Sequence, residues 1–170
     1  SVNDVVVHWL PRDNIIFNQW DVVTFDFWVK DKKHWINTDA AFTMIIWDNP
    51  HNSEVERFLE VNEKALYLWI EQAKVWNTLW DIWHAIEKYV TENWFFIVKD
   101  LAWHGVWKTL HEDPCVYNYW KPWKWPKIKK WMTLDIEPII WFSSWKIYDK
   151  WDWEIYIEEE SIWWQFEQTI

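Results

Sequence analysis

The feature that most constrains this chain is its wealth of tryptophan and near absence of glycine. Its 170 residues include 22 Trp and a single glycine, Gly105, whereas glycine makes up about 7% of ordinary proteins. Tight turns need residues at positive φ, which glycine adopts at little cost and other residues adopt only with strain. The chain has many Asp, Asn, Pro and Lys residues of the kind found in turns. It nevertheless has almost none of the glycine that such turns require.

The tryptophans mostly stand where glycine is expected. Trp20 precedes the apolar run "DVVTFDF", and Trp94 follows Asn93, where a left-handed residue usually closes a helix. Others flank Pro, Lys and Asp in turn-like segments: Trp120, Trp123, Trp125, Trp131, Trp151 and Trp153. We therefore hypothesise that most or all are misdecoded glycines, because the codon UGA specifies tryptophan in one variant genetic code and glycine in another.

The alternative is a true Trp-rich protein whose indoles stack on sugars or on single-stranded nucleic acid. An acidic chain with aromatics in its turns suits that role poorly. The backbone distinguishes the two interpretations. The glycine hypothesis predicts positive φ at Trp20, Trp94, Trp120 and Trp131, whereas real stacking residues would lie together in ordinary strand geometry.

Charge and hydropathy exclude several classes of partner. The net charge of −10 argues against binding to nucleic acid or to an anionic membrane, since both favour a basic surface. No apolar run approaches the roughly 20 residues that span a bilayer, and there is no secretory signal. A lone Cys115 fits a reducing compartment. We expect a soluble, cytoplasmic monomer whose residues 1–170 form one domain. Because the sequence begins at Ser1 and stops at Ile170 within a strand-like run, we also expect it to be a fragment of a longer protein.

Hydrophobic periodicity predicts an α+β fold. Two helices are expected, one from Ser53 to about Lys74 and one from about Thr78 to Asn93, each with apolar residues at helical spacing. Strands are expected before and after the helices, near residues 5–8, 22–29, 41–47, 95–98, 116–119, 132–139, 143–148, 154–158 and 162–166. This order indicates helices packed on one face of a sheet.

Five residues are candidates for a metal site because each lies in or beside an apolar strand, where an unpaired charge is costly: Asp26, Asp39, His104, Glu137 and Glu167. Carboxylates and an imidazole together suit divalent cations. Asp26 and Asp39, on neighbouring strands of an expected hairpin, could face one point. Taken singly, each carboxylate also fits a strand edge and the histidine an ordinary hydrogen bond, and the spacing forms no compact motif.

With Trp replaced by glycine, the chain contains "SVNDVVVHGLP", "GDVVTFDFGVKDKKHGINTDAAFT", "AGHGVGKTLHEDP" and "GMTLDIEP". In this form it resembles methionine aminopeptidase of the shorter, bacterial-type class over essentially its whole length. The resemblance implies the α+β "pita-bread" fold, a curved antiparallel sheet with helices on its outer face. It also implies a centre of two divalent ions (Co, Mn, Fe(II) or Zn) whose ligands correspond to Asp26, Asp39, His104, Glu137 and Glu167.

The resemblance further implies removal of the N-terminal methionine from peptides and nascent proteins, through a hydroxide that bridges the two ions. His8, His111 and Glu137 match the family's catalytic residues: the histidines contact the scissile peptide, and Glu137 also moves the proton of the water. We expect this sequence to be a fragment without the family's N-terminal segment and last C-terminal strand. The literal side chains of Trp103 and Trp107 are expected to crowd His104.

Two alternatives share the fold. One is a proline-specific pita-bread peptidase with a similar ligand set, although "NDVVVHWLP" and the short interval from His104 to Glu137 favour the methionine enzyme. The other is a non-catalytic pita-bread module that binds proteins. Such a module is expected to have lost ligands, whereas all five candidates are present here.

Overall fold

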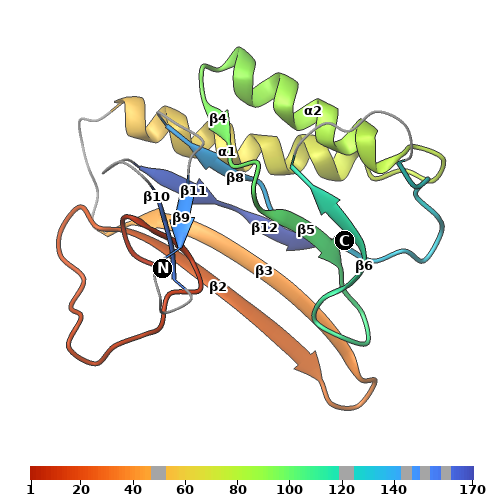
Figure 1. Ribbon diagram of the computed structural model, residues 1–170, viewed down its shortest axis with the longest axis horizontal. Helices are drawn as coiled ribbons and strands as arrows, with labels where there is room; N and C mark the ends of the chain where they lie inside the picture. Colours follow the sequence, from red (N-terminus) through yellow and green to blue (C-terminus); the bar gives the residue numbers. More distant parts are fainter. Residues whose placement is uncertain (47–52, 119–124, 143–146, 150–153, 158–161) are drawn as a thin grey trace.

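The computed structural model describes residues 1–46, 53–118, 125–142, 147–149, 154–157 and 162–170. Its elements, in chain order, are β1 (Val5–Val7), β2 (Val22–Asp31), β3 (Ile36–Ile45), α1 (Ser53–Gln72), α2 (Leu79–Glu92), β4 (Phe96–Ile97), β5 (Ala102–Gly105), β6 (Glu112–Tyr117), β7 (Leu134–Ile136), β8 (Ile139–Trp141), β9 (Ile147–Asp149), β10 (Ile155–Ile157), β11 (Trp163–Gln165) and β12 (Glu167–Thr169). The predicted α+β class is confirmed: in chain order both helices follow β3 and precede β4, and in space they lie together on one side of the strands (Figure 1).

Every strand ladder in the described part of the chain is antiparallel. The strands form three sheets: a six-stranded sheet in the order β2-β3-β12-β7-β5-β6, and two three-stranded sheets, β1-β10-β9 and β11-β8-β4. The last strand in the sequence, β12, therefore lies between β3 and β7. This arrangement brings residues that are far apart in the sequence into adjacent positions.

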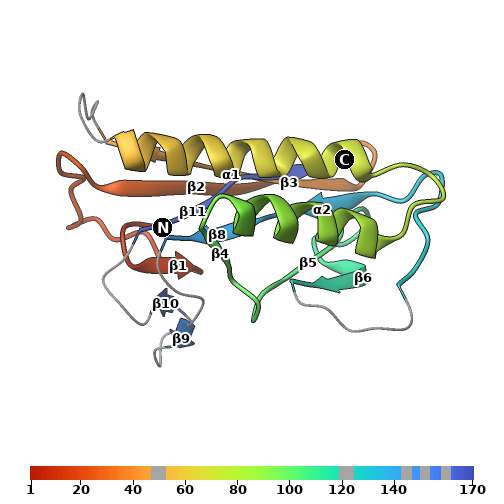
Figure 2. The same ribbon diagram turned by 90° about the horizontal axis from the view of Figure 1, so that it is seen from above.

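The helices pack side by side along one side of the strands (Figures 1 and 2). Thr78 and Asp81 form a capping box at the start of α2, in which Thr78 N–H donates to Asp81 Oδ2 at 2.6 Å. The buried face of α2 is apolar and is formed by Leu79, Ile82, Trp83, Ile86 and Val90. Leu79, Ile82, Ile86 and Val90 share one core with α1 and with the inner face of the strands. The helix-on-sheet packing predicted from periodicity is confirmed.

Several predicted strand boundaries are wrong. The strand expected at residues 41–47 begins earlier, at Ile36, and the strand expected at 132–139 is divided into β7 and β8. Strand β5 was not predicted, because its four residues, Ala-Trp-His-Gly, include no β-branched side chain. The predicted residues 47, 119, 143–146 and 158 lie outside the described part of the chain.

The backbone at three tryptophans has the left-handed geometry that the glycine hypothesis predicts. Trp20, Trp94 and Trp131 have φ angles of 77°, 68° and 71°, and Trp120 lies outside the described residues. Trp35 and Trp76 also have positive φ, so tryptophan supplies five of the seven non-glycine residues with positive φ in the described chain. All five are solvent-exposed. Bulky residues avoid this conformation, so the backbone favours glycine at these positions.

The chain's single glycine, Gly105, occupies a position that admits no side chain. A Cβ atom on Gly105 would lie 2.3 Å from the backbone oxygen of Asp113. This close approach occurs where the chain turns from β5 into β6, directly after His104. Gly105 thus allows β5 and β6 to pack closely beside the candidate metal ligand.

Within the described residues, neither helix is long and apolar enough to cross a membrane.

Candidate metal centre

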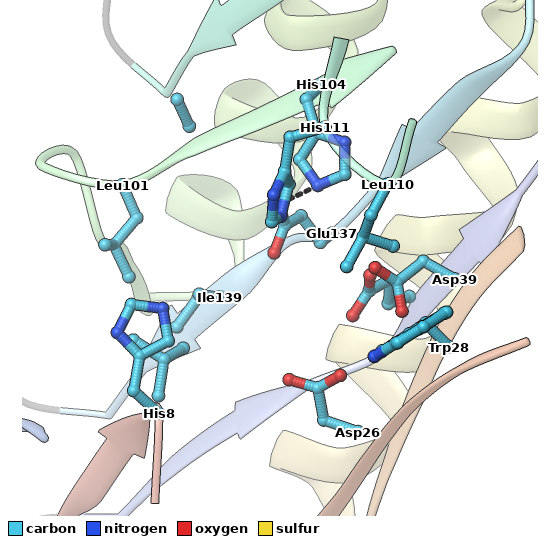
Figure 3. Close-up of a pocket in the computed structure, with 13 residues that line it drawn as sticks. His8, Asp26, Trp28, Asp39, Leu101, His104, Leu110, His111, Glu137 and Ile139 are labelled. Carbon is cyan, nitrogen blue, oxygen red and sulfur yellow. Dashed lines mark ion pairs between the residues drawn. The ribbon is translucent and has the colours of Figure 1, made fainter. Parts of the chain in front are cut away.

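The seven site residues predicted from the sequence line one cavity of about 310 Å³: His8, Asp26, Asp39, His104, His111, Glu137 and Glu167. Figure 3 shows the labelled carboxylates and imidazoles around a common space, with Asp26 and His8 on one side and His104 and His111 on the other. The structure therefore brings together residues that span 159 positions of sequence, from residue 8 to residue 167.

Asp26 and Asp39 reach the cavity from the β2–β3 hairpin. In the antiparallel register Asp26 lies opposite Ala41, and Asp39 lies opposite Trp28. Residues two apart on a strand share a face, so the two aspartates point to the same side of the sheet, as the sequence predicted. Asp39 is 7% exposed, whereas Asp26 lies at the more open rim.

The other three candidate ligands come from the centre of the six-stranded sheet. Glu167 begins β12 and lies opposite Ala41 of β3, which places it beside the hairpin. His104 lies on β5, and Glu137 follows β7 directly. Since β7 lies between β12 and β5, the three side chains reach the cavity from adjacent strands.

His104 is oriented for ligation through Nε2. Its Nδ1 atom lies 3.0 Å from the backbone oxygen of Gly105, so the proton on Nδ1 is donated to that carbonyl. This hydrogen bond leaves the lone pair on Nε2 free to bind a cation. Nε2 lies 3.8 Å from Oε1 of Glu137, a separation suited to two ligands of one ion.

His8 and His111 lie at the entrance of the cavity, and both are exposed. His8 follows β1 and has φ of 63°, a conformation that is strained for a non-glycine residue and that often occurs at functional sites. The segment after His8 is anchored by Glu154, which accepts hydrogen bonds from Leu10 N–H at 3.2 Å and from Arg12 Nη2 at 2.7 Å. These contacts hold His8 at the cavity.

Burial, reinforced by neighbouring negative charges, disfavours ionisation of the carboxylates. Burial, together with the charges of Asp135 and Asp26, raises the pKa of Asp39 to about 7. Burial raises the pKa of Glu137 well above its usual value, and neighbouring aspartates raise it further. Burial, a side-chain hydrogen bond with Asp135 and the charges of adjacent carboxylates likewise raise the pKa of Glu167. Such a cluster is stable in ionised form only with a positive charge among its members.

The residues present fit divalent cations. Four of the thirteen residues that line the cavity are carboxylates, and none is Lys or Arg. Mixed carboxylate and imidazole donors bind Mn, Fe, Co and Zn ions. A cation is therefore the charge that this donor set lacks.

Two polar residues of the site were not predicted. Gln165 is 1% exposed, and its Nε2 donates to Glu167 Oε2 at 2.8 Å and lies 3.4 Å from Glu137 Oε2. Asp135 is fully buried beside His104, its register partner on β5. Their spacing from the candidate ligands could have indicated both residues. Gln165 lies two residues before Glu167, and Asp135 lies two residues before Glu137. In extended backbone, residues two apart point to the same side.

The expectation that Trp103 and Trp107 crowd His104 is wrong. Neither residue lines the cavity. Trp103 is fully buried on the opposite face of β5 and packs against Trp69 of α1, with ring centroids 5.3 Å apart. Adjacent residues on a strand point to opposite faces. The indole that enters the site is instead that of Trp28, which lies between Asp26 and Asp39 (Figure 3).

Known proteins resemble this chain over most of its length. The family model of metallopeptidase family M24 matches residues 1–169. The methionine aminopeptidase of Clostridium acetobutylicum is 29% identical over the whole chain, which covers 67% of that protein. Methionine aminopeptidase 1 of Bacillus subtilis is 34% identical over 82% of the chain, which covers 54% of that protein. The chain thus spans between about half and two thirds of the length of these relatives.

Solved structures give the same result. The methionine aminopeptidase of Thermotoga maritima has a TM-score of 0.92 and 32% identity, and the match covers all of this chain and 67% of that one. An X-Pro aminopeptidase of the same organism has a TM-score of 0.63 at 16% identity, which shows a shared fold. The resemblance to bacterial methionine aminopeptidases and the pita-bread fold predicted from it are confirmed. The chain belongs to metallopeptidase family M24, whose members use divalent metal ions.

Proposed function

We propose that this chain forms the catalytic core of a cytoplasmic methionine aminopeptidase, which hydrolyses the bond after an N-terminal methionine in peptides and nascent proteins. The observation that carries the proposal is the convergence of His8, His111 and the five candidate ligands on one cavity. A non-catalytic module has no need for this complete set of acids and imidazoles.

Asp26, Asp39, His104, Glu137 and Glu167, which line one cavity, would hold two divalent ions. The four carboxylates carry a charge of −4 when ionised, which two divalent ions balance. When bound, such ions lower the pKa of a shared water and supply hydroxide near neutral pH.

The protein's own residues would then direct the reaction. Glu137 accepts the proton of the attacking water and passes it to the leaving amine as the carbon–nitrogen bond breaks. His111 donates a hydrogen bond to the carbonyl oxygen, where negative charge develops. His8 holds the scissile amide nitrogen. The free amino terminus of the substrate lies near Asp26, on the more open side of the site.

The cavity also has an apolar part that suits a methionine side chain. Val7, Leu101, Leu110 and Ile139 line it beside the polar residues. An unbranched thioether fits such a small apolar surface well. The N-terminal methionine would occupy this part of the cavity while its scissile carbonyl faces the carboxylates.

The test is hydrolysis of a Met-Ala-Ser peptide by two forms of the full-length protein. One form has tryptophan at these positions, as in the given sequence, and the other has glycine in their place. Mn²⁺, Co²⁺ and Fe²⁺ are each supplied after removal of metal with a chelator. We expect metal-dependent release of free methionine by the glycine form. N-acetyl-Met-Ala-Ser and the Glu137→Gln variant serve as controls, and neither should give product.

Two outcomes would decide against the proposal. Hydrolysis of Ala-Pro-Ala but not of Met-Ala-Ser would identify a proline-specific peptidase. The absence of hydrolysis with all three ions, in a folded protein, would favour a binding module.

A further inference from the structure

Asp135 is a buried carboxylate next to the candidate metal centre to which the proposed function assigns no role. It lies on β7, opposite His104 of β5 and opposite Thr169 of β12. Its exposed fraction is zero. Burial of a carboxylate without compensation is among the most costly arrangements in a protein interior, so the position of Asp135 needs a physical explanation.

The hydrogen bonds of Asp135 do not supply one. Its Oδ1 atom lies 3.2 Å from the hydroxyl oxygen of Thr169, but the same hydroxyl lies 2.9 Å from the backbone oxygen of Asp39. One hydroxyl proton cannot serve both acceptors. The Oδ2 atom has no hydrogen-bond partner among the described residues. A protonated Glu167 would donate a hydrogen bond to Asp135. When both carboxylates are ionised, Asp135 therefore retains a buried oxygen without a donor.

That carboxylate has the position of a metal ligand. One ligand atom from each of Asp39, His104 and Asp135 can be chosen such that all three lie within 4.8 Å of one another. Donors of a transition-metal ion lie about 2.0–2.2 Å from it, and so at most about 4.4 Å from one another. Three donors around one ion are about 3.8 Å or less from one another when evenly spaced, so the three side chains need to approach by at most about one ångström to share an ion.

We propose that Asp135 is a sixth ligating side chain of the centre and binds the divalent ion held by His104. The proposal rests on the proposed function for the presence of that ion. With Asp135 the centre has five carboxylates instead of four. The additional oxygen ligand shifts its preference toward oxygen-seeking cations such as Mn²⁺, because carboxylates favour Mn²⁺ whereas thiolates and imidazoles favour softer ions.

The decisive variant is Asp135→Asn, which keeps the shape of the side chain and an oxygen acceptor for Thr169 but removes the charge. Mn²⁺ binding is measured by isothermal titration calorimetry on the metal-free protein, without substrate. We expect the dissociation constant of the tighter Mn²⁺ site to rise by at least roughly 10- to 100-fold, the loss typical even of residues that only support a ligand. Glu60→Gln, an equal charge change on the exposed face of α1, should leave the constant unchanged.

A second measurement separates direct ligation from support of His104. Co²⁺ is added to each protein, and its visible absorption bands report the number and geometry of its ligands. Loss of a direct ligand changes the position and intensity of the bands, whereas weaker binding with the same ligands leaves their shape unchanged at saturation. Asp135→Ser is measured in parallel in case Asp135→Asn does not fold, and thermal melting without metal verifies folding.

The outcomes separate the two proposals. If the original protein binds two Mn²⁺ ions and Asp135→Asn binds them equally well, with an unchanged Co²⁺ spectrum, Asp135 is not a ligand, although the proposed function stands. If Asp135→Asn changes only the melting temperature, and neither Mn²⁺ binding nor the Co²⁺ spectrum, Asp135 is likewise not a ligand. If the original protein binds no divalent ion, both proposals fail.

Discussion

The imidazole rings of His104 and His111 meet edge to face, with ring centroids 4.3 Å apart and an interplanar angle of 80°. Only 12% of the His104 side chain is exposed, whereas His111 lies at the entrance of the cavity. Burial lowers the pKa of His111, and the charge of His104 lowers it further. Two adjacent histidines therefore have different environments, one suited to a metal ion and the other to a neutral group facing substrate.

Replacing these histidines should separate binding from catalysis. We expect His111→Asn to lower kcat for Met-Ala-Ser by roughly 100-fold or more, the loss typical of one donor to a developing oxyanion, with Mn²⁺ affinity unchanged. His104→Asn should instead weaken Mn²⁺ binding in calorimetry. His84→Asn, on the exposed face of α2, is the control. Loss of Mn²⁺ binding in His111→Asn would contradict this division of roles.

Gln165 should act by positioning the glutamates. Gln165→Leu removes the donor to Glu167 and Glu137, so we expect Mn²⁺ affinity to fall roughly 10- to 100-fold. The chain offers a matched control, because Gln168 lies on β12 but is exposed, and within the described residues its side chain donates to the backbone oxygen of Thr169. Gln168→Leu should bind Mn²⁺ normally. Equal affinities in the two variants would show that Gln165 does not support the ligands.

The metal-free protein should be more stable in mild acid than in mild base. The pKa of Asp39 is about 7 in the folded state, above its ordinary value of 3.8, so folding binds a proton at intermediate pH. The resulting stabilisation is complete below about pH 4 and is lost as the pH rises through 7. Glu137 and Glu167 shift in the same direction. We expect a higher melting temperature at pH 5.5 than at pH 8.

Two controls define the origin of this pH dependence. Saturating Mn²⁺ should reverse it, because the ion binds the ionised carboxylates. Asp39→Asn should weaken it, because the variant lacks one of the titrating groups. A metal-free melting temperature that rises from pH 5.5 to pH 8 would contradict the shifted pKa values.

Glycine at the strained tryptophans should stabilise the fold. Trp20→Gly, Trp94→Gly and Trp131→Gly each relieve a positive-φ strain of about 1–2 kcal/mol, which urea unfolding can measure. Trp107→Gly is the control, since Trp107 is exposed but does not have positive φ, and should give no such gain. Equal or lower stability in all three variants would refute the glycine hypothesis for these positions.

Local signals in the sequence predicted the helices well. The expected bounds of both helices lie within two residues of the observed ones, because capping residues and apolar spacing act over a few neighbouring residues. Strand boundaries were less accurate. Strand β5 was not predicted, and the strand expected at residues 132–139 is divided into β7 and β8. The ends of a strand depend on its pairing partners, which are distant in the sequence.

The sequence by itself determined the α+β class, the family resemblance and seven of the thirteen residues that line the cavity. Each of these depends on residue type and order along the chain. Only the tertiary structure decided that Trp28 enters the site while Trp103 turns away, and that Gln165 and Asp135 lie beside the ligands. The physical reason is register: which face a strand residue occupies, and which residue lies opposite, is set by pairing with strands far away in the sequence.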